Sequence, residues 1–327
     1  MTAGGPGKLS TPTLACIAVG GVISGDFFGW QNTLEGGLGG ALLSAWVAGL
    51  LFLLLSVCVA ELTARLPRAA GPFGFAHAAF GPRAGFAAGL AELQKVVVVT
   101  AVINVGLSSY LASLLGVAGA QGSGLPATHA APLLLQGGAL ALFAALQSLG
   151  LDASVRIQVG TCAVSVAVLA LFYVYAPAAG ATDARAHALA NGWFNGQGVS
   201  GVLRCLPFGI WFWLGIEELP LAARECRDDP RRALPRALLA AWGVLFACTT
   251  LTVVVSASSP PGLDGVLRSQ HPLLASFEGV LGPRGKGTAR ALSVLMLARH
   301  TFLRNTFADR ARLHCTATQY GPDPHSG

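Results

Sequence analysis

The sequence predicts an all-α protein that crosses a membrane several times, and three observations carry this prediction. Of its 327 residues, 53% are hydrophobic and only 11% are charged, and the mean hydropathy is +0.61. Soluble domains carry about 25% charged residues. Several apolar segments also exceed the roughly 18 residues that mark a membrane span. An alanine- and leucine-rich soluble bundle is the alternative, and the length of these segments argues against it.

The first three expected spans differ in character. Residues 13–30 form an apolar segment that Gly20, Gly21, Ser24, Gly25 and Asp26 interrupt. Residues 38–60 are continuous, and the loop after Glu61 carries arginines. Residues 84–115 are long enough to cross a bilayer at a steep tilt.

Four further spans follow. Residues 133–149 come after a linker without lysine or arginine, and a short turn with Asp152 and Arg156 leads into residues 157–176. The sixth segment, residues 203–223, is interrupted around Gly215–Glu218. The seventh covers residues 237–257, after a loop rich in arginine.

Beyond the seventh span the chain changes character. We expect a cytoplasmic tail over residues 1–12, a transmembrane domain over 13–258, a loop with a short surface helix over 259–290, and a disordered tail over 291–327. The best apolar run of the last part, residues 291–298, is too short to span a bilayer.

The basic residues predict the orientation. The net charge of +6 is concentrated in a few loops, a pattern that sets membrane topology and does not indicate nucleic-acid binding. A cytoplasmic N-terminus puts Arg185 and Arg204 alone outside before residue 260. The cytoplasmic side then holds Lys8, Arg65, Arg68, Arg83, Arg156, Arg224, Arg227, Arg231, Arg232 and Arg236. We therefore expect a multi-pass protein of the plasma membrane, and not a seven-span receptor, which has the opposite orientation.

No constellation of residues indicates catalysis or metal binding. The seven cysteines are scattered without a C-x-x-C spacing and are interpreted as small buried apolar residues. The G-x-G patterns lie in spans and lack a strand–turn–helix context. We expect no enzyme activity, no catalytic residue, no metal and no cofactor. The first span is expected to serve as the insertion signal, since no cleavable leader is apparent.

Spans one and six carry the features that point to function. They lie five spans apart, and both contain a glycine break with a carboxylate. Irregular backbone survives in a membrane only where protein or a water-filled cavity surrounds it. Paired broken helices are typical of inverted-repeat transporters, which bind their substrate between the breaks. Close helix packing is the alternative role of such glycines, and we accept it for Gly36–Gly40.

Three motifs resemble the amino acid–polyamine–organocation superfamily, and the first span looks most like ethanolamine permeases. The motifs are Val22-Ile23-Ser24-Gly25-Asp26-Phe27-Phe28-Gly29-Trp30, Pro67 to Pro82 after span two, and Trp211-Phe212-Trp213-Leu214-Gly215-Ile216-Glu217 with the following Asp228 to Arg236 loop. The resemblance covers about residues 13–280. It implies a sodium-transporter-like fold of ten core spans, of which about seven are recognisable here, so the later spans are expected to be missing.

The resemblance also implies a substrate site. Ile23, Ser24, Gly25 and Asp26 would line it from span one, and Trp211, Gly215 and Glu217 from span six. Trp211 falls at the superfamily's aromatic gate, and Glu217 at a gating or proton-linked carboxylate. Because a carboxylate in a membrane is costly, Asp26 and Glu217 are predicted to pair with an ammonium group. The alternative for Glu217 is that it caps a half-helix or bonds across to span one.

Glu92 and Lys95 are the other charged pair within a span. Their spacing of three residues lets them meet on one helix face. We prefer a self-neutralising pair, and the alternative gives Lys95 a cation-substituting or coupling role.

Two functions remain open. The first is a secondary transporter that moves a small amine or amino acid, such as ethanolamine, by alternating access with possible proton coupling. The second is a truncated or non-transporting membrane protein that lacks the later half of the fold. The expected partners are a small-molecule substrate and the lipid bilayer, with no nucleic acid and with an open oligomeric state.

Overall fold

The computed structural model describes residues 9–66, 71–115, 130–147 and 151–282, and these ranges are almost entirely helical. One isolated pairing, between Leu9 and Cys226, is the only β-type contact among them. The helices are α1 (Thr11–Val22), α2 (Gly37–Arg65), α3 (Gly71–Phe80), α4 (Pro82–Leu115), α5 (Ala130–Gln147), α6 (Leu151–Ala178), α7 (Ala184–His187), α8 (Gly198–Gly209), α9 (Pro230–Ser258), α10 (Gly262–Leu267), and 3₁₀ segments η1 (Ile23–Asp26), η2 (Gln31–Gly36), η3 (Ile210–Phe212) and η4 (Ile216–Glu225). A final helix covers Pro272–Gly282.

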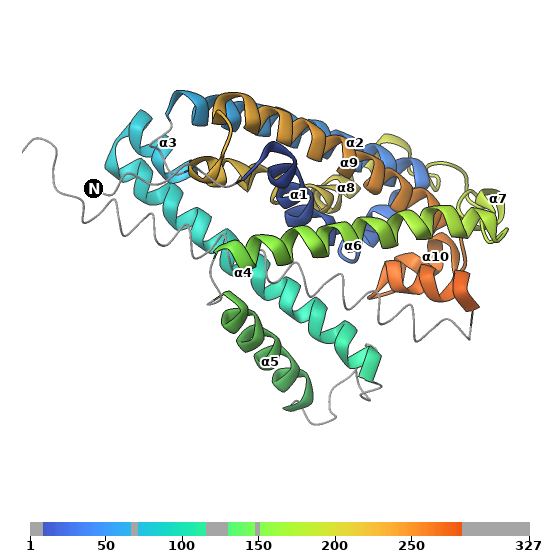
Figure 1. Ribbon diagram of the computed structural model, residues 1–327. Helices are drawn as coiled ribbons and strands as arrows, with labels where there is room; N and C mark the ends of the chain where they lie inside the picture. The colour runs from blue at the N-terminus through green and yellow to red at the C-terminus, as the bar shows by residue number, and fades with distance from the viewer. Residues whose placement is uncertain (1–8, 67–70, 116–129, 148–150, 283–327) are drawn as a thin grey trace, which may run out of the picture.

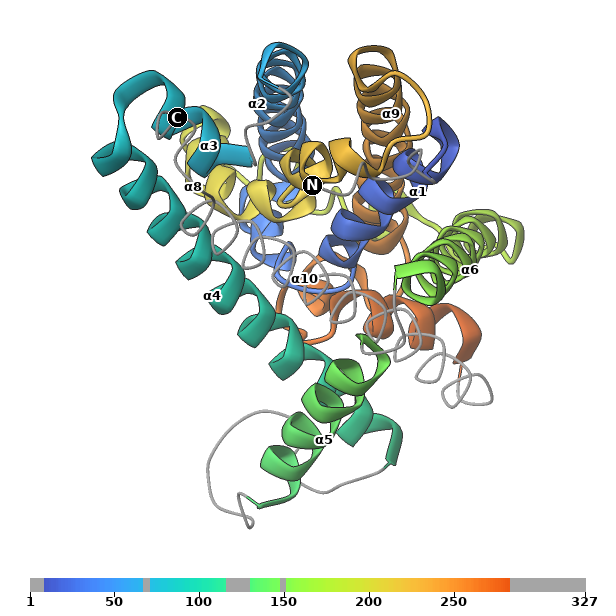
Figure 2. The same cartoon turned by 60° about the vertical axis from the view of Figure 1, so that its left-hand side comes forward.

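Helices α1 and α8 lie among the long helices, whereas the short helices α3, α7 and α10 lie at the edges of the molecule (Figure 1). Helix α9 packs against α1, α2 and α6, while α2 also packs against α8. Turned by 60°, the molecule shows α4 running diagonally away from this group with α5 beside its far end (Figure 2). The two broken segments, α1–η1 and α8–η3–η4, therefore lie where the long helices converge.

The fold confirms a polytopic helical membrane protein. Five helical stretches of the described chain are long and apolar enough to span a bilayer: Gln31–Arg65, Pro82–Leu115, Val155–Ala178, Gly198–Leu219 and Pro230–Ser258. Of the other two expected spans, α1 is cut to 12 residues by its break and α5 has a short apolar stretch. Exposed leucines on α2, such as Leu50 and Leu54, are suited to contact with lipid.

Three segments expected to be loops are helical. Helix α3 occupies most of the loop expected after span two, and α6 begins at Leu151, so Asp152 and Arg156 lie inside it. Helix α9 begins at Pro230, because the Asp229 carboxylate caps it by accepting the Arg231 N–H at 3.1 Å. Half of the expected arginine-rich loop is thus the first two turns of a helix. The expected tail, residues 291–327, lies outside the described residues.

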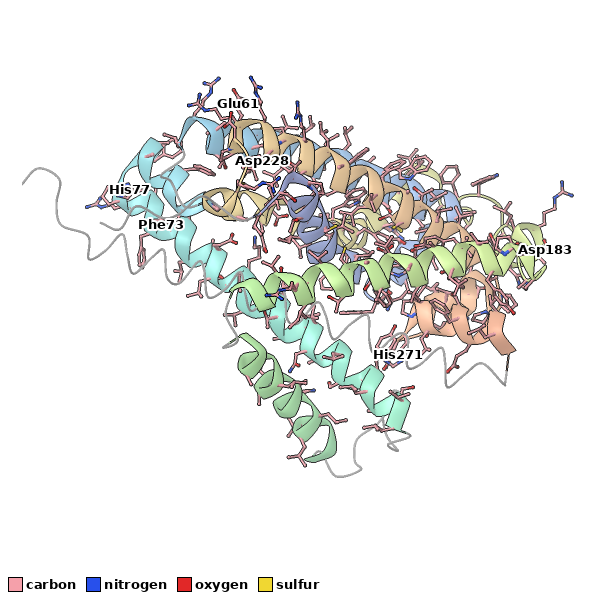
Figure 3. All side chains as sticks on the ribbon, viewed as in Figure 1. Glu61, Phe73, His77, Asp183, Asp228 and His271 are labelled. Atoms are coloured by element: carbon pink, nitrogen blue, oxygen red, sulfur yellow. The ribbon has the colours of Figure 1, made fainter. Side chains whose placement is uncertain are left out.

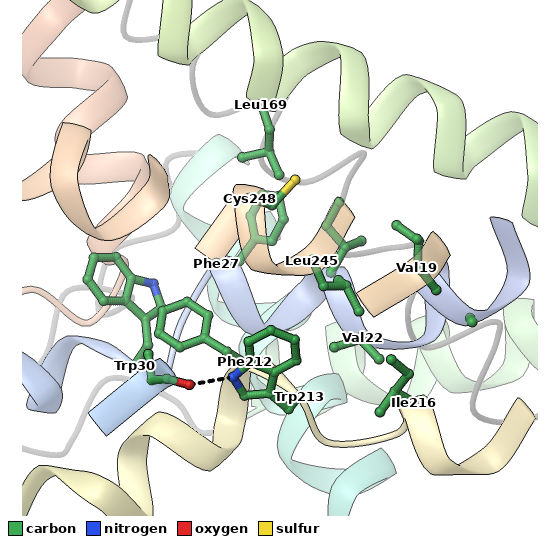
Figure 4. Packing of buried hydrophobic residues seen from close by; sticks show 14 of the residues in the cluster. Val19, Val22, Phe27, Trp30, Leu169, Phe212, Trp213, Ile216, Leu245 and Cys248 are labelled. Atoms are coloured by element: carbon green, nitrogen blue, oxygen red, sulfur yellow. Dashed lines mark hydrogen bonds between the residues drawn. The ribbon is translucent and has the colours of Figure 1, made fainter. Parts of the chain in front are cut away.

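Aromatic side chains form the core around the two breaks. Phe27, Trp30, Phe212 and Trp213 are all at most 1% exposed. Figure 4 shows them gathered with apolar residues of α1, α6 and α9. The Trp213 indole N–H donates to the Ala45 carbonyl at 2.9 Å, which fixes the second break against α2. Rigid aromatic packing therefore holds both breaks in place.

Polar contacts tie the beginning of α1 to the segment before α9. The Thr11 hydroxyl and backbone N–H both donate to the Asp228 carboxylate, at 3.1 and 3.3 Å. These bonds, with a smaller effect from Arg227, lower the pKa of Asp228. Figure 3 shows Asp228 beside α1. Hydrogen bonds thus connect the start of α1, in the first broken segment, to the chain that follows η4, in the second.

On the opposite side, the segment after α10 packs on α4. His271 and Ser109 share a hydrogen bond of 2.8 Å, and the His271 ring meets Tyr110 edge-on at 4.2 Å between centroids. Phe277 packs on Phe172 of α6. Figure 3 shows His271 beside the segment that follows α10. The helix at Pro272–Gly282 thus bridges α4 and α6.

Candidate functional site

The first break begins where α1 ends at Val22. The chain continues as one turn of 3₁₀ helix, η1, and then reverses at Gly29, whose φ of +91° favours glycine. The Trp30 indole N–H donates to the Asp26 carbonyl at 2.9 Å, and the Gln31 side chain accepts the Gly29 N–H at 2.7 Å. Side chains therefore form hydrogen bonds with some of the backbone N–H and C=O groups that lack a helical partner at the break.

The second break lies between η3 and η4. Gly215 has a φ of +112°, which a residue with a Cβ rarely adopts. The Glu217 carboxylate reaches back to accept the Gly215 N–H at 2.8 Å, so it caps the start of η4 as the glutamate of a capping box does. The expected interruption around Gly215–Glu218 is confirmed. The capping role was the alternative expected for Glu217.

The two breaks are in direct contact. A Cβ added to Gly25 would lie 2.5 Å from the Trp211 carbonyl oxygen, and one added to Gly29 would lie 2.7 Å from the Trp211 indole nitrogen. Phe28 also packs on the Trp211 ring, with centroids 5.7 Å apart. The glycines of the first break are therefore required for the approach of the second.

Trp211 carries a polar group without a partner at this contact. Its indole N–H is buried and makes no hydrogen bond in the structure. A buried donor left unpaired costs about 1–3 kcal/mol. An orphan donor between two broken helices is suited to an acceptor atom of a bound solute.

The Asp26 side chain contacts α9. Its side chain is 1% exposed and accepts a hydrogen bond of 2.8 Å from the Thr252 hydroxyl. The Tyr173 hydroxyl of α6 lies 2.7 Å from the same Thr252 oxygen. Tyr173, Thr252 and Asp26 thus form one polar chain across α6, α9 and η1.

Lys95 of α4 contacts the second break. Its ammonium lies 3.3 Å from Glu217 and 3.2 Å from Glu218, and 2.9 Å from Glu92 on its own helix. These four side chains are between 5% and 24% exposed. The Glu92–Lys95 pair expected from the sequence is present, and the break adds two carboxylates to it. No group of three or more His, Cys, Asp or Glu in the described ranges is arranged to hold a metal ion.

The structure places the expected site residues in different surroundings. Gly25, Trp211 and Gly215 belong to the contact between the breaks, and Ile23 is a buried core residue at 2% exposed. Asp26 and Glu217 have different partners, Thr252 and Lys95. For Ser24 the structure describes the backbone alone. The pairing of Asp26 and Glu217 with one ammonium stays a prediction.

Thr252 and Tyr173 were not singled out from the sequence. A signal was present, because Thr249, Thr252 and Ser256 recur at helical spacing within the apolar seventh span and are all 0% exposed. A polar stripe on a membrane helix indicates a face buried against other helices.

A multi-span helical protein organised around two packed, broken helices is the class that this geometry defines. The family described as amino acid permease matches residues 9–304, and the chain belongs to that family.

Curated relatives extend this assignment. The chain is 27% identical over 252 residues to an uncharacterized transporter of Rhizobium meliloti (strain 1021), which covers 75% of this chain and 51% of that protein. It is also 27% identical over 268 residues to cationic amino acid transporter 4 of Mus musculus, covering 76% of this chain and 41% of that protein. The human protein of the same name gives 27% over 266 residues. The chain thus aligns with about half the length of these relatives, or less.

Proposed function

We propose that this protein is a secondary transporter that moves a small amine or amino acid, such as ethanolamine, across a membrane by alternating access. The observation that carries the proposal is the contact between the two breaks, where Gly25 and Gly29 meet Trp211. Irregular backbone at such a point frees hydrogen-bonding groups for a solute. We place the protein in the plasma membrane with a cytoplasmic N-terminus, in keeping with its arginine distribution.

The chemistry around the breaks suits a solute with an ammonium group and an oxygen acceptor. The buried Trp211 N–H would donate to a hydroxyl or carboxylate oxygen of the solute. Its ring would contribute a cation–π contact of about 0.5–2 kcal/mol to the ammonium. Asp26 and Glu217 would supply the negative charge that pairs with it. Membership of the amino acid permease family and similarity to relatives named as cationic amino acid transporters support a solute of this type.

In this proposal the same two carboxylates, Asp26 and Glu217, couple solute transport to proton movement. Asp26 is almost fully buried and accepts a hydrogen bond from a neutral hydroxyl, that of Thr252, so its charge state changes the polarity of the first break. An ammonium that arrives at a carboxylate can replace a proton there without a change in net charge. Proton exchange or symport would supply the driving force.

Uptake into proteoliposomes tests the proposal. Labelled ethanolamine, arginine and alanine are offered to vesicles that hold the purified full chain, with and without an inward proton gradient. We expect accumulation of at least one of them above empty vesicles and a large loss in Glu217→Gln. Glu61→Gln is the matched control, since Glu61 pairs with Arg65 at the exposed end of α2. Absence of uptake for all three solutes would leave a non-transporting membrane protein as the better description.

A further inference from the structure

Lys95 is the only lysine in the described ranges, and it lies among three carboxylates. One of them, Glu92, is three residues earlier on α4, whereas Glu217 and Glu218 are consecutive residues of η4. Lys95 therefore makes one contact within its own helix and two contacts with the second break. The contacts with η4 are those that a movement between the two segments would break.

The backbone of the second break brings Glu217 and Glu218 together. Both occupy the first turn of η4, directly after the reversal at Gly215. The start of a helix attracts negative charge because its backbone N–H groups are free. Two neighbouring carboxylates can therefore face one cation here, as they do with Lys95.

The charges of this group do not cancel. With all four side chains ionised, three carboxylates and one ammonium leave a net charge of −2. Removing the cation from a largely buried group of this kind leaves carboxylates without compensation, which is strongly unfavourable. If η4 separates from Lys95, another cation is needed at Glu217 and Glu218. Lys95 itself keeps Glu92, so its own charge stays paired.

We propose that Lys95 is a tethered competitor of the transported ammonium, and this inference rests on the proposed function. Without a solute its primary ammonium forms ion pairs with Glu217 and Glu218 at 3.3 and 3.2 Å, and a solute with a primary ammonium carries the same charge and the same three donors. An arriving solute ammonium takes over these carboxylates, and Lys95 retracts to Glu92. One cation replaces another, so the exchange leaves the net charge of the second break unchanged. Lys95 is therefore a positioning residue that sets the affinity for amines.

A competitor and a structural ion pair make different predictions for two variants. In Lys95→Ala the competitor is gone, so the KM for ethanolamine uptake falls about tenfold. The maximal rate falls too, because nothing displaces the bound amine from the carboxylates. In Glu92→Gln the retracted position is lost, so Lys95 stays on Glu217 and Glu218 and the KM rises. A merely structural pair gives no such opposed shifts.

The experiment measures KM and maximal rate in proteoliposomes, with ethylammonium as a competing probe. Ethylammonium inhibits uptake by Lys95→Ala at about tenfold lower concentration than uptake by the wild type. Lys95→Arg retains the wild-type KM, and Arg65→Met serves as a control for loss of an exposed cation. If Lys95→Ala does not purify as a folded protein, the KM of Glu92→Gln alone tests the inference, and a rise in this KM supports it.

The inference is overturned by folded variants whose KM values and ethylammonium sensitivity match the wild type, or shift in the opposite directions. In that outcome wild-type uptake continues and the proposed function stands. An absence of wild-type uptake of ethanolamine, arginine and alanine, by contrast, removes the proposed function itself.

Discussion

Thr252 donates a hydrogen bond of 2.8 Å to the Asp26 carboxylate, and this bond joins the first break to the last long helix of the described chain. The two residues are 226 positions apart in the sequence. Asp26 is 1% exposed and Thr252 is 0% exposed, so water does not replace the bond if it is lost. The geometry of the break therefore depends on α9.

Thr252→Val removes the donor and leaves the buried carboxylate short of a partner. We expect a loss of about 1–3 kcal/mol in the free energy of unfolding, seen as a lower melting temperature in detergent. Thr249→Val is the matched control on the same helix, since the Thr249 hydroxyl is buried and makes no hydrogen bond. That variant is expected to be neutral or more stable. Equal destabilisation by both variants would contradict a specific role of the bond.

Gly25→Ala tests the contact between the breaks. The added Cβ would lie 2.5 Å from the Trp211 carbonyl oxygen and 3.1 Å from the Phe212 Cα, and backbone cannot yield as a side chain does. We expect loss of uptake with a clear fall in melting temperature. Gly40→Ala, where nothing lies within 4 Å, should instead be neutral or stabilising by up to about 1 kcal/mol. An active and stable Gly25→Ala protein would show that the breaks do not need to touch.

Trp211→Phe separates binding from stability. The Trp211 indole N–H has no partner, so its removal costs no hydrogen bond in the empty protein, and the ring contact with Phe28 persists. We expect a small fall in melting temperature from the lost indole volume beside Gly29, and a KM raised by about tenfold for a solute that accepts this hydrogen bond. A variant that melts lower but binds equally well would assign Trp211 to packing alone.

Acid pH is expected to weaken the contact between His271 and α4. Burial lowers the pKa of His271 below its ordinary value of 6.5, although the charge of Glu278 opposes this effect. A depressed pKa means that the neutral ring is favoured in the folded protein. Its stabilisation is present above about pH 6.5 and is lost as the pH falls through the lowered pKa.

The measurement is the melting temperature between pH 7.5 and 5.0, with His271→Gln as the comparison. The wild type should lose stability toward the acid end, and the variant should lose less, because its amide does not titrate while it can still reach Ser109. Identical pH profiles for the two proteins would exclude His271 as the source.

The sequence allowed the breaks to be predicted, because glycines and carboxylates inside apolar runs are local signals. The Glu92–Lys95 pair was predictable for the same reason, since a spacing of three fixes their proximity on any helix. Its extension to Glu217 was not, because 122 residues separate Lys95 from that carboxylate and the register between the segments depends on packing.

Helix boundaries were less predictable where arginines cluster. The charge of the run from Arg224 to Arg236 predicts a loop, although Asp229 followed by Pro230 is a helix-start signal. Helix α3 was missed for a similar reason, since glycines and basic residues surround a short segment. Partners such as Thr252 also needed the structure, because a polar stripe indicates a buried face without identifying what it contacts.

Uptake of labelled ethanolamine into proteoliposomes by the wild type and by Asp26→Asn tests the central claim most directly. The claim is that the two breaks form a solute site in which Asp26 supplies charge. It predicts accumulation by the wild type above empty vesicles and a KM at least about tenfold higher in the nearly isosteric variant, which keeps an acceptor for Thr252. Wild-type uptake with an unchanged KM in Asp26→Asn would contradict the role of Asp26, and no wild-type uptake of ethanolamine or amino acids would contradict the transporter itself.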